Sequence, residues 1–289
     1  MKIAVVFSAE SRTFNSASAA EWLVWKNKIE ENYDIEFTFY GHTWDHCPDH
    51  EIPNSEILPL SDIWIDSENI ISDWICELYM PRVYFSRTDT YIGKIDPDND
   101  ATKIKFIDEM LFHSRRHWGQ HVSGFLSFKN IPENQRNQFD GFIKARWDSA
   151  PILIDPRLDS TVNDIIFDLK VKSLIDFFNS TGATFGSNIS GTGIGHKPGF
   201  NPEIDITPND VVFFMTTQAV RNFTSSRDVI SFMNKIEHLN SHGLTAHSLW
   251  AAIFSYQQIC YKPDNDTKPM FRFKLVRPPN YRPKEYKYF

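Results

Sequence analysis

The chain has 289 residues, of which 41% are apolar and 15% aromatic, so it can bury a substantial core. Only 12 residues are glycine while 24 are phenylalanine, which argues against a disordered chain or a repeat array. The formal net charge is -7, yet residues 268–289 hold seven basic side chains and one acidic one. This basic end predicts either contact with a polyanion or docking on the chain's own acidic body.

The sequence predicts a protein that does not insert into membranes. No stretch approaches the roughly 18 apolar residues that a membrane helix needs. The apolar start, Ile3 to Phe7, is too short for a secretory signal and instead predicts a buried strand. Three cysteines at wide spacings form neither a metal motif nor a disulfide framework. We therefore expect a cytoplasmic protein with reduced thiols.

The first forty residues predict the opening of a doubly wound α/β sheet. Residues 3–7 are continuously apolar, as in a parallel strand that is buried on both faces. Residues 16–29 repeat apolar side chains at helical spacing, and residues 34–40 alternate as a second strand. The order strand, loop, helix, strand is typical of this class.

Further elements follow along the chain. The stretch 46–69 is rich in Pro, Asp, Glu and Ser, which predicts a loop or a small insertion. Helices are expected at 104–128, 171–178, 229–239 and 246–259, strands at 139–147, 211–215 and 271–276, and a glycine-rich loop at 182–199.

The loop after the first predicted strand is a candidate ligand site, because open α/β sheets bind ligands beyond the carboxyl ends of their strands. The Ser8 hydroxyl in this loop and the start of the helix that follows are suited to binding phosphate. Arg12 could pair with a phosphate or stack on a base. The alternative is an ordinary polar turn that caps the helix.

Two aspartates follow later strands and define the next candidates. Asp45 ends the segment His42-Thr43-Trp44-Asp45. It is either a site residue or a residue whose hydrogen bonds stabilise its own loop. Asp148 follows Arg146-Trp147, where one carboxylate is enough for Mg²⁺ or Mn²⁺ when a diphosphate supplies other ligands. The alternative is a surface aspartate paired with Arg146.

His247 opens the last predicted helix and is either a metal ligand, a base or a structural residue. The sequence contains no H-E-x-x-H, C-x-x-C or G-x-S-x-G motif. A zinc enzyme and a serine hydrolase are therefore unsupported.

Three segments recur in a fixed order. They are Lys2-Ile3-Ala4-Val5-Val6-Phe7-Ser8 with Arg12-Thr13-Phe14, then His42-Thr43-Trp44-Asp45, and then Phe142-Ile143-Lys144-Ala145-Arg146-Trp147-Asp148. Together they resemble a group of phage, giant-virus and bacterial glycosyltransferase-like proteins. Members of the group typically have a first strand that enters an S-G-x-x-R-T loop, an H-T-W-D stretch and a strand ending in R-x-R-F-D. This chain departs from the pattern where Ala9-Glu10 replaces Gly-Gln, and where no second Asp precedes Asp148 by two residues.

The resemblance implies an α/β, GT-A-like fold in which a Rossmann-type, mostly parallel sheet is flanked by helices and joined to an acceptor-side lobe. Residues 1–150 then form the nucleotide-sugar-binding half, 151–267 the acceptor-side half and 268–289 a basic aromatic tail. It implies Ser8 and Arg12 near the nucleotide, with Asp45 and Arg146 as further donor-binding candidates. Asp148 falls at the metal-binding position, and His247 near the pyrophosphate.

The implied reaction moves a sugar from a nucleoside-diphosphate sugar to a hydroxyl. Mg²⁺ or Mn²⁺ held by Asp148 and His247 would neutralise the diphosphate leaving group. If the reaction inverts, either Asp210 or His247 would deprotonate the acceptor hydroxyl. A non-catalytic nucleotide- or glycan-binding module of the same fold is the alternative from another class.

Two classes of acceptor remain open. One is a saccharide or a lipid-linked glycan. The other is double-stranded DNA carrying hydroxymethylcytosine, in which case the protein is phage-encoded and acts in the host cytoplasm. The basic aromatic end and the segment Arg115-Arg116-His117-Trp118 favour DNA, since cations follow phosphates and an aromatic ring fills the gap of a flipped base. The charge of residues 1–267, which is -13 once the +6 of the basic end is taken from the total of -7, opposes it.

Overall fold

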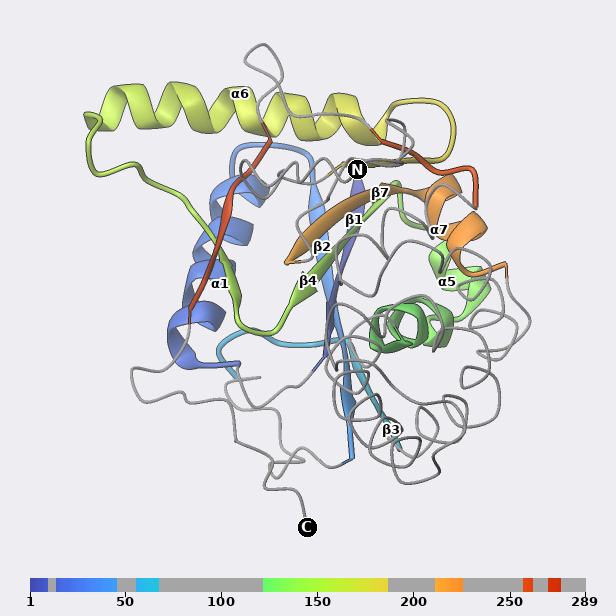
Figure 1. The fold of residues 1–289 in the computed structure, drawn as a ribbon. Coiled ribbons are helices and arrows are strands. Elements are labelled where there is room, and N and C mark those ends of the chain that lie inside the picture. The colour runs from blue at the N-terminus through green and yellow to red at the C-terminus, as the bar shows by residue number, and fades with distance from the viewer. Residues whose placement is uncertain are drawn as a thin grey trace, which may run out of the picture.

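A seven-stranded sheet forms the centre of the molecule (Figure 1). The computed structural model describes residues 1–9, 14–45, 56–67, 122–186, 211–225, 257–261 and 270–276. Within them the sheet has the strand order β3-β2-β1-β4-β7-β6-β8, and a separate two-stranded sheet joins β5 to β9. The strands are β1 (Lys2–Ser8), β2 (Glu36–Trp44), β3 (Asp62–Asp66), β4 (Gly141–Arg146), β5 (Ser149–Pro151), β6 (Thr184–Gly186), β7 (Val212–Thr216), β8 (Cys260–Tyr261) and β9 (Phe273–Leu275).

The sheet is mostly parallel. β3, β2, β1 and β4 are parallel neighbours, and β6 is parallel to β8. β7 runs antiparallel to both β4 and β6, so it is the one reversed strand among those described in this sheet. The predicted fold class, an α/β fold with a mostly parallel sheet flanked by helices, is confirmed.

Helices lie on both faces of the sheet (Figure 1). On one face, α1 (Ser16–Glu30) and α6 (Ser160–Phe178) bury Trp22, Trp25 and Phe167 in the same core as the strand residue Val5. On the other face lie the helical residues 122–130, α5 (Glu133–Arg136) and α7 (Thr217–Phe223). There the ring of Phe128 packs edge-on against that of Phe142 in β4, with the centroids 5.9 Å apart. Both faces of the sheet are therefore covered, as parallel strands require.

Local side-chain caps set the starts of these helices. The side chain of Asn15 accepts a hydrogen bond from the Ser18 N–H at the start of α1, and Asp159 accepts one from the Val162 N–H at the start of α6. Thr216 caps α7 in the same way. Each cap satisfies a backbone donor that the first turn of a helix leaves without a partner.

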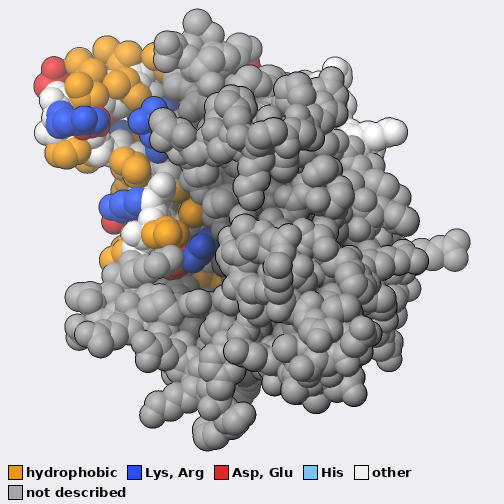
Figure 2. Space-filling view, in the orientation of Figure 1, with side chains coloured by type: hydrophobic (Ala, Val, Ile, Leu, Met, Phe, Trp, Pro, Cys, Tyr) orange, Lys and Arg blue, Asp and Glu red, His pale blue; other side chains and the backbone are white. Residues whose placement is uncertain are grey.

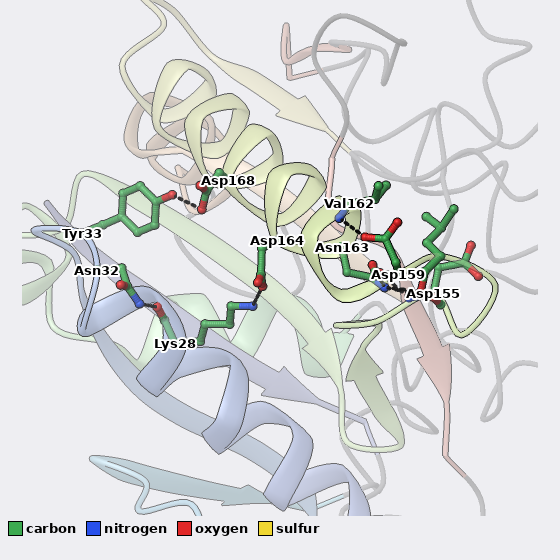
Figure 3. A network of polar contacts seen from close by, with 10 residues as sticks. Lys28, Asn32, Tyr33, Asp155, Asp159, Val162, Asn163, Asp164 and Asp168 are labelled. Atoms are coloured by element: carbon green, nitrogen blue, oxygen red, sulfur yellow. Dashed lines mark hydrogen bonds and ion pairs between the residues drawn. The ribbon is translucent and has the colours of Figure 1, made fainter.

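Polar pairs attach α6 to the last turn of α1 and to the turn that follows it. The ammonium of Lys28 lies 2.8 Å from a carboxylate oxygen of Asp164, and the Tyr33 hydroxyl donates to Asp168 at 2.7 Å (Figure 3). The outer side of α6 and the segment before it remain apolar and exposed, as the hydrophobic side chains at the upper left of Figure 2 show. The exposed apolar residues there are Ile154, Leu158, Val162, Ile165 and Leu169.

A cluster of aromatic rings fills the core beneath the carboxyl ends of β1 and β4. The ring of Phe7 stacks on Trp147 at 5.1 Å between centroids, and meets Trp22 edge-on at 5.5 Å. Gly41 in β2 allows this packing, because a Cβ at that position would lie 2.4 Å from the Trp147 ring. The packing of Trp147 in this core therefore fixes the turn that carries it.

Several sequence predictions need correction or extension. The stretch 46–69 is not entirely loop, because Asp62–Asp66 forms strand β3 at the edge of the sheet. The second strand continues beyond residue 40 to Trp44, so the His42-Thr43-Trp44 segment belongs to the sheet and is buried. The helix predicted at 171–178 begins at Ser160. Residues 257–259, predicted as a helix end, form a turn.

The last predicted strand exists as β9, which pairs antiparallel with β5. Predictions at 104–121, 187–199, 229–239 and 246–256 lie outside the described residues. None of the helices in the described ranges is long and apolar enough to cross a membrane.

Candidate functional site

The carboxyl ends of β1, β2, β3 and β4 meet at one edge of the sheet, because these four strands are parallel neighbours. The chain places β2 and β3 on one side of β1 and β4 on the other, so the strand order reverses between β1 and β4. Such a switch point is where open α/β sheets bind ligands. Ser8 ends β1 there and lies in register with Arg146 of β4. Two predicted donor-binding residues are thus neighbours at the switch point.

The end of β1 has two unusual features. The Ser8 side chain is fully buried, and its Oγ has no hydrogen-bond partner among the described residues. A buried hydroxyl without a partner is uncommon in folded proteins. Ala9 follows with a φ of 88°, which is the left-handed region that favours glycine. The chain therefore leaves β1 in a strained turn at the switch point.

Arg146 and Asp148 form a two-point ion pair. The Arg146 Nε donates to Asp148 Oδ1 and Nη2 donates to Oδ2, both at 2.9 Å. The side chain of Asp148 is 2% exposed and that of Arg146 is 17% exposed. Paired N–H donors that face both oxygens of a carboxylate are the strongest geometry of this kind. Asp148 therefore fixes the guanidinium of Arg146 at the rim of the switch point.

This pairing does not fit a divalent metal at Asp148. Mg²⁺ and Mn²⁺ need carboxylate oxygens turned toward the ion, whereas both oxygens of Asp148 face the Arg146 guanidinium. Within the described ranges, no three His, Cys, Asp or Glu side chains form a group that could hold a metal ion. In this structure the carboxylate of Asp148 is therefore paired with Arg146.

A chain of hydrogen bonds connects the ends of β1, β2 and β3. The Ala9 N–H donates to Ser123 Oγ at 2.7 Å. Ser123 Oγ lies 2.8 Å from His42 Nδ1, and His42 Nε2 lies 2.9 Å from Asp66 Oδ2. The helical residues 122–130 provide Ser123, and the ends of β2 and β3 provide the other two.

The direction of each hydrogen bond follows from the charge states. Burial lowers the pKa of His42, so the ring is neutral at neutral pH. The hydrogen bond from His42 lowers the pKa of Asp66, so this carboxylate is ionised and can only accept. Nε2 of His42 must therefore carry the proton, and Nδ1 must accept from the Ser123 hydroxyl. Each group in the chain has one consistent role.

We expect this chain of groups to make the fold less stable in mild acid. The pKa of His42 is lowered from its ordinary value of 6.5 in the folded protein, so the unfolded chain binds a proton first as the pH falls. The free energy of unfolding should decline below about pH 6.5, and the lowered pKa of Asp66 adds to the decline at more acidic pH. Urea unfolding at pH 5 and 7.5 measures this. His42→Gln should flatten the profile in this range, and an unchanged profile would contradict the assignment.

The structure brings together some of the predicted site residues. Ser8, Arg146 and Asp148 lie around the switch point, as described above. Asp45 is exposed just beyond the end of β2, and its backbone N–H donates to the carbonyl of Asp66 at 3.0 Å. The predicted residues Arg12, Asp210 and His247 lie outside the described residues.

Asp66 and Ser123 were not identified from the sequence as site residues. Asp66 lies in the stretch that was predicted to be a loop, so its place at a strand end was not visible. The run Ile63-Trp64-Ile65 consists of β-branched and aromatic side chains, which are enriched in strands, and could have indicated that strand. Ser123 stands within a helical pattern and belongs to no motif.

Comparison with solved structures finds distant matches to sugar transferases. No protein-family model and no curated protein matches the sequence. The structure of mouse xyloside xylosyltransferase 1 matches with a TM-score of 0.39 and 8% identity over 91% of this chain and 85% of that one. The galactosyltransferase LgtC, bound to donor and acceptor sugar analogues, matches with a TM-score of 0.38 and 10% identity over 90% and 73%. The structure of an active-site mutant of LgtC matches with a TM-score of 0.40 and 10% identity over 90% of this chain and 72% of that one. At these scores the likeness has no bearing on activity.

Proposed function

We propose that this chain is a glycosyltransferase that moves a sugar from a nucleoside-diphosphate sugar to a hydroxyl. One observation carries the proposal: three segments that resemble glycosyltransferase-like proteins end at the same edge of the sheet. The segments ending at Ser8, Asp45 and Asp148 are far apart in sequence, and the parallel pairing of β1 with β2 and β4 brings them together. If the three segments were unrelated turns, they would not be expected to lie together at the edge where open α/β sheets bind ligands.

The roles of the residues follow from their chemistry. Ser8 and the turn at Ala9 receive the donor at the switch point, and Arg12, which follows them in sequence, is assigned to the same donor. Arg146 supplies positive charge near the diphosphate, where negative charge grows as the sugar leaves. Asp148 keeps the guanidinium in place through two hydrogen bonds of 2.9 Å. Asp210 or His247 takes the proton of the acceptor hydroxyl.

A glycan hydroxyl is the acceptor that we propose first. The basic end of the chain was the main reason to consider DNA. Within that end, the ammonium of Lys274 lies 2.9 Å from a carboxylate oxygen of Glu21 in α1. This pair is an instance of docking on the chain's own acidic side chains, which was the alternative reading of the basic end.

Release of free nucleoside diphosphate tests the proposal. A panel of sugar nucleotides is incubated with the protein, in Mn²⁺ or in EDTA, with a mixture of oligosaccharides or with DNA containing hydroxymethylcytosine. Release from one donor that oligosaccharides stimulate supports a glycan transferase, whereas stimulation by the modified DNA alone would replace the glycan by DNA. Release that persists in EDTA is expected from the Arg146–Asp148 pair. No release and no binding of any donor would overturn the proposal, while tight donor binding without release would indicate a binding module.

A further inference from the structure

We infer that Asp66 is the carboxylate that binds a sugar hydroxyl of the donor, held in position by the chain His42–Ser123–Ala9. The inference deepens the proposed function and rests on it. Its ligand chemistry is a hydroxyl of a sugar ring, which a nucleotide sugar offers on its ribose and on the sugar that it transfers.

Asp66 has an oxygen available for such a hydroxyl. The side chain is 33% exposed at the carboxyl end of β3. The contacts to Asp66 from the described side chains all use Oδ2: His42 Nε2 lies at 2.9 Å and the Asn130 amide nitrogen at 3.5 Å. Oδ1 therefore keeps its capacity to accept, and an ionised carboxylate accepts hydroxyl protons well.

His42 cannot turn away from Asp66, so it fixes the orientation of the carboxylate. The ring is fully buried, and both of its nitrogens have partners. The ring of Trp44 meets it edge-on at 5.0 Å between centroids. Ser123 in turn accepts the N–H of Ala9, so the same chain fixes the strained turn after β1. One network thus positions the end of β3 and the turn after β1, which lie on either side of β2.

The distance between the ends of β3 and β1 matches the length of a nucleotide. Neighbouring strands lie about 4.8 Å apart, so the end of β3 lies on the order of 10 Å across the sheet from the end of β1. A diphosphate at Ser8 and Arg146 would extend its nucleoside or its transferred sugar over the same edge. An oriented carboxylate at that distance from the switch point suits the vicinal hydroxyls of a sugar ring.

Binding of a hydroxyl suits Asp66 better than removal of a proton. The hydrogen bond from His42 lowers the pKa of Asp66, so the carboxylate holds a proton weakly. A general base works best when its pKa lies near the working pH. The role that fits is therefore a fixed acceptor that selects ligands carrying the hydroxyl.

Calorimetric binding of nucleoside diphosphates to the full chain, in EDTA, tests the inference. The probes are UDP, GDP, CDP and ADP, followed by the 2′-deoxy and 3′-deoxy forms of the one that binds most tightly, and by a sugar nucleotide with the same base. Asp66→Asn retains an oxygen that can accept from His42 and removes the charge. Asp62→Asn is the matched control, because Asp62 is exposed at the opposite end of the same strand, and points to the same face.

Asp66→Asn should weaken binding of the ribonucleotide about tenfold, as expected for a hydrogen bond to a charged group, and leave a deoxy form unaffected. If the hydroxyl belongs to the transferred sugar, the loss should appear only with the sugar nucleotide. Asp62→Asn should bind like the unaltered protein. Equal affinity of Asp66→Asn and unaltered protein for every probe would overturn the inference.

The unaltered protein provides a second measurement that does not depend on the folding of a variant. If Asp66 binds a ribose hydroxyl, a deoxy form should bind about tenfold more weakly than the ribonucleotide. If it binds the transferred sugar, deoxygenation of that sugar should cause the loss. No discrimination in either series would overturn the inference. Failure of all probes to bind is a different result, which would remove the proposed function itself.

Discussion

Replacement of Asp148 by Asn is expected to lower the free energy of unfolding by about 3 kcal/mol, because it leaves the charge of Arg146 without its counterpart in a nearly buried site. The two side chains are 2% and 17% exposed, so water can replace little of the lost interaction. The amide can accept one hydrogen bond from the guanidinium, but its NH₂ group faces the second N–H donor. Sugar transfer should fall at least a hundredfold, since a displaced guanidinium no longer stabilises the leaving group. Urea unfolding and the release of nucleoside diphosphate measure the two effects.

The chain contains a matched control for this variant. Asp155 and Arg157 form a two-point pair at the same sequence spacing, with distances of 2.9 and 2.6 Å. This pair lies at the surface, with Arg157 85% and Asp155 32% exposed, and Arg157 lowers the pKa of Asp155 to about 2. Exposed pairs contribute little to stability, so Asp155→Asn should leave both unfolding and transfer nearly unchanged. Equal effects of the two variants would show that the burial of the Arg146–Asp148 pair is unimportant.

Apolar patterning allowed the centre of the fold to be predicted from the sequence. Continuous apolar runs identified β1 and β7, and helical spacing of Trp22 and Trp25 identified α1, because each pattern reflects burial that the structure confirms. The direction of β7 could not be predicted in this way, since a buried strand has the same pattern in either direction. β3 was missed because a five-residue edge strand between polar segments has too few buried residues to stand out.

The candidate site was predictable only in part. Ser8, Arg146 and Asp148 follow apolar strands, so their position at the edge followed from the fold class. The pairing of Arg146 with Asp148 was expected for a surface aspartate, whereas the structure shows this pair with Asp148 only 2% exposed. His42 contacts Asp66, which is 24 residues away in sequence, and Ser123, which is 81 residues away. Contacts of this kind depend on strand order and helix position, which no local pattern contains.

Replacement of Trp147 by Ala is expected to lower the free energy of unfolding by about 3–5 kcal/mol. The side chain is 1% exposed and packs against the rings of Phe7 and Phe14 at 5.1 and 5.3 Å. Its indole N–H also donates to the carbonyl of His42 at 2.9 Å. The variant would therefore leave a cavity in the core and a buried carbonyl without its donor. Denaturant unfolding, with the unaltered chain as the reference, measures the change.

The two contributions can be separated with a second tryptophan. Trp25 is also fully buried, but its indole N–H has no hydrogen-bond partner in the part of the chain that the structure describes. Trp147→Phe should cost about 1–3 kcal/mol more than Trp25→Phe, because only the first loses a buried hydrogen bond. Trp147→Phe should also weaken donor binding, since the His42 carbonyl and the turn carrying Arg146 and Asp148 are both held by this side chain. If both Phe variants lose the same stability and retain donor binding, Trp147 serves the core alone and does not position the edge where the donor is expected to bind.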